Sequence, residues 1–65
     1  MLKFSIHARE RMALRCISKE QIREAIKRGS KHLQKPNKIV SEYRYFSVVF
    51  TVQKDCIYVI TVQIR

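Results

Sequence analysis

The second half of the chain limits the fold most, because its residue types favour strands almost throughout. Two runs, IVSEYRYFSVVFTVQ and CIYVITVQI, are rich in β-branched and aromatic residues and contain neither glycine nor proline. Lys54 and Asp55 form the clearest break between the runs and predict a short hairpin turn. An earlier strand near residues 39–43 is expected to pair with the next one after a turn near Arg44. The sequence therefore predicts an antiparallel sheet of three or more strands.

The hairpin register predicts which side chains share a face of this sheet. If Gln53 pairs with Cys56, one face carries Phe46, Val48, Phe50, Val52, Ile57, Val59 and Thr61. The other face then carries Val49, Thr51, Tyr58, Ile60, Val62 and Ile64. Both faces are substantially apolar. We therefore expect helices on one face, and on the other a partner, a second protomer, a ligand or an exposed apolar patch.

Residues 19–28 are predicted to form a helix because both ends carry stop and start signals. Ser18 and Gln21 have the spacing of a capping box, and Ile17 and Ile22 that of a hydrophobic staple. Basic residues occupy the last turn, where they suit the helix dipole. Gly29, the only glycine, is expected to end the helix in the left-handed conformation.

Residues 4–17 predict an earlier helix, capped by Ser5 and ending near Arg15 or Cys16. At about 100° per residue, its apolar side chains fall on one side, namely Ile6, Ala8, Met12, Ala13 and Cys16. His7, Arg11 and Arg15 fall together on the opposite side, where Glu10 flanks His7.

The order of elements predicts the α+β class, with two N-terminal helices on one face of an antiparallel sheet. Only three residues separate the helices, so we expect a helical hairpin or a sharp corner. Residues 30–38 are expected to be a basic loop, with Pro36 and Asn37 as its turn residues. The 65 residues form one domain, 1–65, whose small core favours a homodimer or another partner.

The net charge of +9 is concentrated early in the chain. Residues 1–35 hold ten basic and three acidic side chains, whereas residues 36–65 hold four and two. One basic surface favours a polyanion partner such as RNA, although a merely solvated basic surface is the alternative. No apolar run approaches the roughly 18 residues of a membrane span, and no signal-peptide order is present. We expect a cytoplasmic protein without membrane contact.

The two cysteines and two histidines do not indicate a metal or redox site. Cys16 and Cys56 lack metal-ligand spacing and do not form a disulfide framework, so small buried apolar roles are expected. His7 and His32 are far apart, and the carboxylates are scattered. No metal and no cofactor is predicted.

The run SIHARERMALRCISKEQIREAIKRG, residues 5–29, resembles the signature of the family called domain of unknown function 4258. The pattern is S-x-H-A-x-x-R-M-x-x-R-x-I-S-x-x-x-I-x-x-A-I-x-x-G, and VITV at residues 59–62 is similar to the family's C-terminal part. Cys16 departs from the glycine often found before the isoleucine. The resemblance implies kinship with RelE/ParE-like toxins, which share two helices on an antiparallel sheet. Those proteins belong to a group of metal-independent ribonucleases, many act with a cognate antitoxin, and some members inhibit DNA gyrase instead.

Metal-independent RNA cleavage needs a group that moves protons and groups that stabilise the phosphate. Histidine suits the first task because its unperturbed pKa is near 6.5, and arginine suits the second through its charged fork. We assign catalysis to His7, Glu10, Arg11 and Tyr45, with Glu10 as second base or orienting group and Tyr45 as stacking group or proton donor. RNA contacts are assigned to Arg15, Lys31, Lys35, Lys38 and Arg44, and, mainly through the VITV resemblance, to Thr61.

Each assignment has an ordinary structural alternative. The arginines, His7 and the loop residue His32 can be simply solvated, and tyrosines in a small sheet are more often core or rim residues. The leading hypothesis is a toxin-like endoribonuclease that leaves a 2′,3′-cyclic phosphate and a 5′-hydroxyl on RNA, including ribosome-bound mRNA, under antitoxin control. The other hypothesis is a non-catalytic module that binds nucleic acid or a protein, including a gyrase-inhibitor-type toxin.

Overall fold

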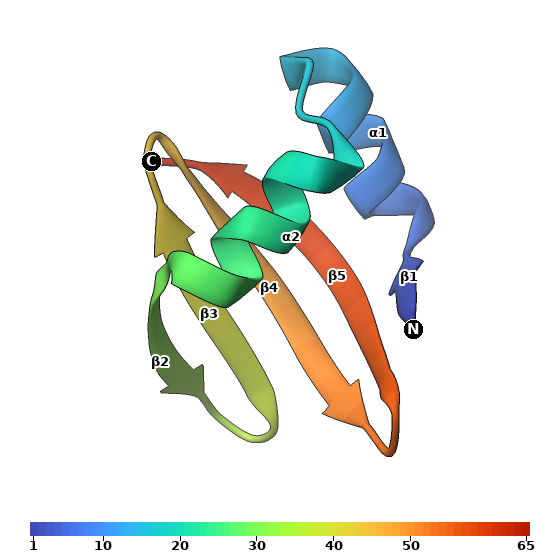
Figure 1. Cartoon of the computed structure of the whole chain (residues 1–65), viewed down its shortest axis with the longest axis vertical. Coiled ribbons are helices and arrows are strands. Elements are labelled where there is room, and N and C mark those ends of the chain that lie inside the picture. The colour runs from blue at the N-terminus through green and yellow to red at the C-terminus, as the bar shows by residue number, and fades with distance from the viewer.

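The computed structural model describes residues 1–65 and has two helices on one face of a five-stranded sheet (Figure 1). Its elements are β1 Leu2–Phe4, α1 Ile6–Arg15, α2 Lys19–Arg28, β2 Ser30–Gln34, β3 Lys38–Tyr43, β4 Phe46–Gln53 and β5 Cys56–Ile64. The strand order is β1-β5-β4-β3-β2. Helix α1 packs against β5, and α2 packs across β3 and β4 (Figure 1). The α+β class is confirmed, and neither helix is long and apolar enough to cross a membrane.

The sheet has five strands, where three or more were predicted, and it is not purely antiparallel. Strands β3, β4 and β5 form the predicted antiparallel meander. Residues 30–34, predicted as loop, instead form β2 antiparallel to β3, and β1 pairs in parallel with β5. Sequence patterns miss both edge strands for physical reasons. β1 has only three residues, and all five side chains of β2 are exposed, so backbone pairing rather than burial holds β2 in place.

A β-bulge in β5 changes the predicted faces of the sheet. The predicted register of Gln53 opposite Cys56 is confirmed. Further along, Phe50 lies opposite Val59 but Val49 lies opposite Thr61, which leaves Ile60 as the extra residue. Beyond this point every side chain of β5 points to the face opposite to the one predicted.

The helix side of the sheet therefore gains two apolar residues that were assigned to the other side. Val62, opposite Val48, is only 1% exposed and belongs to the core beneath the helices. Ile64 lies opposite the core residue Phe46, whereas Thr61 faces away from the helices. On the helix-free face, Val49 is only 4% exposed, whereas Tyr58 is 38% exposed.

The core lies between the helices and this corrected face of the sheet. It is formed by Ala8, Met12, Ile17, Ile22, Ala25, Phe46, Val48, Phe50, Val59 and Val62. Only part of the predicted apolar side of α1 takes part. Ala8 and Met12 are buried, but Ala13 and Cys16 are exposed and Ile6 is 74% exposed. Because α1 packs mainly along the single strand β5, it buries a narrow stripe rather than a broad side.

The predicted capping residues are present at the starts of both helices, but the left-handed residue is at the end of α1 and not at the end of α2. The capping box of Ser18 and Gln21 is confirmed. Gly29 is not left-handed, since its φ is −70° and its ψ is 163°. The left-handed residue is Cys16, with φ 56° and ψ 41°, at the end of α1. The Ile17 N–H then donates to the Met12 carbonyl at 2.9 Å, which closes a Schellman-type turn.

Candidate nucleic-acid interface

The position of α1 is fixed by contacts between Ser5 and the bulge of β5. The Ser5 N–H donates to the Val59 carbonyl at 2.9 Å, and its hydroxyl donates to the Ile60 carbonyl. The same hydroxyl accepts the Ala8 N–H at 3.0 Å as the helix cap. One serine therefore starts the helix and attaches it to the sheet, which determines where the exposed side of α1 points.

His7 and Glu10 meet on this exposed side. The two side chains are 84% and 66% exposed, and His7 Nδ1 lies 4.0 Å from Glu10 Oε1. That distance permits an ionic contact when the imidazole is protonated but is too long for a hydrogen bond. The predicted proximity of this imidazole and this carboxylate is present in an open, solvated setting.

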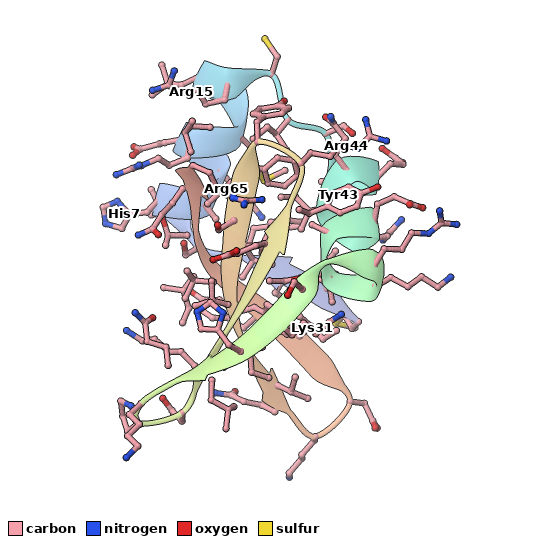
Figure 2. All side chains as sticks on the ribbon, turned by 90° about the vertical axis from the view of Figure 1, so that its left-hand side faces the viewer. His7, Arg15, Lys31, Tyr43, Arg44 and Arg65 are labelled. Atoms are coloured by element: carbon pink, nitrogen blue, oxygen red, sulfur yellow. The ribbon has the colours of Figure 1, made fainter.

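The arginines of α1 are free of intramolecular partners. Arg9, Arg11 and Arg15 are exposed, and none takes part in an ion pair or a side-chain hydrogen bond. Glu10 is the only carboxylate on the helix. Figure 2 shows His7 and Arg15 pointing away from α2, on the same side of the molecule. Helix α1 thus presents several uncompensated positive charges to solvent.

A second group of basic residues lies at the β3–β4 turn and the end of β5. The Arg44 guanidinium lies 5.3 Å from the Tyr43 ring centre, a cation–π contact. Arg65 Nη1 donates to the Arg44 carbonyl at 2.9 Å, and its Nη2 lies 3.8 Å from Glu42 Oε1. Sequence reasoning did not select Arg65, because it belongs to no motif and its contacts depend on strand pairing. Figure 2 shows Arg65 between the side that holds His7 and the side that holds Arg44.

Tyr45, assigned to catalysis, is a half-exposed residue of the β3–β4 turn. Its side chain is 48% exposed and its ring lies edge-on to Phe46, with centres 5.2 Å apart. No hydrogen bond of its hydroxyl is present. The ring is available for stacking, although nothing in its contacts joins it to His7.

The remaining assigned residues are spread over other parts of the surface. Lys31 Nζ donates to the carbonyls of Lys27 at 3.3 Å and Gly29 at 3.2 Å, so it caps the end of α2. Figure 2 shows Lys31 on the α2 side, opposite His7. Lys35 is exposed in the β2–β3 turn, Lys38 begins β3, and Thr61 is half-buried on the helix-free face.

Neither surface hollow contains a predicted catalytic residue. One of about 300 Å³ is lined by Met1, Leu2, Arg23, Ile26 and Ile57. The other, of about 230 Å³, is lined by Glu20, Gln21, Glu24, Tyr43 and Arg44. No three His, Cys, Asp or Glu side chains gather where they could hold a metal ion. The exposed side of α1 is therefore a convex charged surface and not a cleft.

Residues 4–64 match the model of the protein family described as Domain of unknown function (DUF4258). The match covers nearly the whole chain, from the strand before Ser5 to the end of β5. No curated protein and no solved structure matches the chain significantly.

Proposed function

The chain belongs to the family of domain of unknown function 4258, and from its surface we propose that it binds RNA through the exposed side of α1. The observation that carries the proposal is that Arg9, Arg11 and Arg15 have no partner within the protein. Binding therefore breaks no intramolecular ion pair. Contacts between arginine and phosphate release counterions from the nucleic acid, which supplies affinity without sequence preference.

The spacing of these groups also suits a phosphate chain. Arg11 and Arg15 are four residues apart on one helix, so their Cα atoms are separated by about 6 Å along the axis. Each guanidinium can donate two aligned hydrogen bonds to a phosphate. His7, one turn before Arg11, extends the row. An RNA strand that follows the helix would therefore meet successive positive groups on a rigid support.

The test is fluorescence anisotropy of a labelled single-stranded RNA at several salt concentrations. Replacing both Arg11 and Arg15 with Gln should weaken binding and reduce the slope of log affinity against log salt by about 0.7 for each lost phosphate contact. The matched control replaces Arg23 and Lys27 of α2, which removes the same charge from the other side of the molecule. Equal weakening in both variants would contradict a binding site on α1.

RNA cleavage is the second candidate function, and the His7–Glu10 pair is the observation that favours it. In this reaction the 2′-oxygen loses its proton and attacks phosphorus, and the 5′-oxygen leaves after gaining a proton. His7 would transfer these protons while Arg11 stabilises the phosphorane. The kinship with RelE/ParE-like toxins, the antitoxin partner and the cytoplasmic location belong to this proposal.

Cleavage is tested by incubating RNA and ribosome-bound mRNA with the protein in the presence of a chelator. The expected products carry a 2′,3′-cyclic phosphate and a 5′-hydroxyl. His7→Ala should abolish their formation while His32→Ala, the same change on β2, leaves it intact. If wild-type protein binds these RNAs but leaves all of them uncut, the protein is a binding module only.

A further inference from the structure

The outer edge of β2 carries backbone groups that have no partner. β2 is the last strand in the sheet order, and its inner edge pairs with β3 from Ser30 to Gln34. None of the backbone hydrogen bonds outside the helices and strands involves a residue of β2. Alternate N–H and C=O groups of an edge strand point outward, where they can pair with a further strand.

This edge lacks most of the features that usually prevent strand addition. Edge strands are commonly shortened, bulged, broken by proline or protected by lysine. β2 has five regularly paired residues and no proline. Its one lysine, Lys31, is turned back to the carbonyls of Lys27 and Gly29 (Figure 2). By contrast, the opposite edge strand, β1, has only three residues.

The side chains of β2 also contribute nothing to the core. All five are exposed, and Leu33 is 80% exposed although it is a large apolar residue. Leu33 lies opposite Ile39, which packs against the core, so Leu33 continues that apolar row to the open edge of the sheet. A strand added at this edge would cover Leu33 with its own side chains.

The charge around the edge determines which kind of strand fits. Lys31, His32, Lys35 and Lys38 lie on β2, in the following turn and at the start of β3. Pairing with β2 of a second copy would bring these basic groups together, and each copy carries a net charge of +9. RNA lacks the alternating N–H and C=O groups of a strand. We propose that β2 binds an extended acidic segment of another protein, which adds as a sixth strand and places an apolar side chain on Leu33.

The first test uses a nine-residue peptide of alternating Glu and Val as the probe. Titration should shift the backbone NMR signals of residues 30–34 most strongly. Two further peptides are N-methylated, one at every Val and one at every Glu. In a paired strand, the N–H groups of either the Val residues or the Glu residues face β2, and those of the other residues face away. The peptide that is methylated on the facing N–H groups should bind about tenfold more weakly, whereas the other methylated peptide should keep its affinity. Equal affinity of all three peptides, or shifts centred on α1, would overturn the proposal.

The second test changes the protein. Leu33→Glu should weaken binding of the peptide about tenfold, whereas Val52→Glu is the matched control. Val52 is 55% exposed, lies at the end of β4 and receives the same charge change. Equal weakening would show that general charge, and not the β2 edge, holds the peptide. Self-association of the wild-type chain that Leu33→Glu abolishes would assign the edge to a second copy and also overturn the proposal. The Arg11 and Arg15 replacements should leave peptide binding at β2 intact, so this test is independent of RNA binding.

Discussion

At the residue scale, Cys16 and Gly29 show that the left-handed end of a helix is not always the one that carries a glycine. Gly29 follows Lys27 and Arg28, a pattern that predicts a left-handed glycine cap. The structure requires glycine at this position for lack of space, because a Cβ there would overlap Ser41 Oγ and the Ala25 carbonyl. Ser41 approaches from β3, which no local pattern can reveal. Cys16, at the end of α1, holds the left-handed position instead.

Cys16→Gly should stabilise the protein. The left-handed conformation costs an L-residue with a Cβ about 1–2 kcal/mol, and glycine avoids most of this strain. A gain of about 1 kcal/mol corresponds to a rise in melting temperature of roughly 4–8 °C for a domain of this size. Thermal unfolding followed by circular dichroism measures it. Ala13→Gly, an exposed change inside the same helix, should lower the melting temperature instead. An unchanged or lower melting temperature for Cys16→Gly would show that the backbone of Cys16 is not strained.

Gly29→Ala should destabilise the protein by about 1–3 kcal/mol, as overpacking of a dense region does. The neighbouring Ser41 cannot move aside easily, because it is fully buried and donates to the Ala25 carbonyl. Urea unfolding measures the loss. Ser41→Gly in the Gly29→Ala background removes one of the overlapping atoms, so the effects of the two changes should be less than additive. Strict additivity would show that the two residues do not compete for space.

At the scale of whole elements, the parts specified by neighbouring residues are the parts that sequence predicts. Helix α2 occupies residues 19–28 as predicted, because its caps lie within a few residues of its ends. The turn at Lys54 and Asp55 is likewise local. The bulge at Ile60 is not, since the carbonyl of Ile60 accepts a hydrogen bond from Ser5, which lies 55 positions earlier in the chain. A single extra residue therefore reversed the predicted direction of every following side chain.

Replacing Val62 and Thr61 in turn tests this reversed face. Val62→Ala removes two buried methyl groups and should destabilise the protein by about 2–3 kcal/mol. Thr61→Ala, on the helix-free side, should change stability by well under 1 kcal/mol. Urea unfolding of both variants measures the difference. A larger loss of stability in Thr61→Ala than in Val62→Ala would instead support the register without a bulge.

At the scale of the whole molecule, the reach of the net charge of +9 depends on the salt concentration. The Cα atoms extend 28 × 21 × 18 Å, whereas the screening length is about 30 Å at 0.01 M salt and about 10 Å at 0.1 M. At low salt, nearly all the positive groups repel one another. The exposure of His7, Glu10, Arg11 and Arg15 on one helix was predictable, because a single local element carries all four side chains. Tyr45 and Lys31 could not be placed from sequence, because their positions depend on long-range pairing and on the end of α2.

Added sodium chloride should therefore stabilise the fold. We expect the urea midpoint to rise between about 0.02 M and 0.3 M salt, because screening removes most of the self-repulsion of the compact state. The variant without Arg11 and Arg15 should show a smaller rise, since it carries less charge. A midpoint that falls or stays constant with salt would mean that the few ion pairs outweigh the repulsion.

The pairing of β1 with β5 and the attachment of Ser5 to Ile60 have a consequence for the order of events during synthesis. The ribosome makes α1 before β5, the strand on which it packs. Until β5 has left the exit tunnel, α1 has no surface to pack on and its arginines are attached to an unfolded chain. The exposed side of α1 therefore takes its place in the fold only after β5 has been made and has paired.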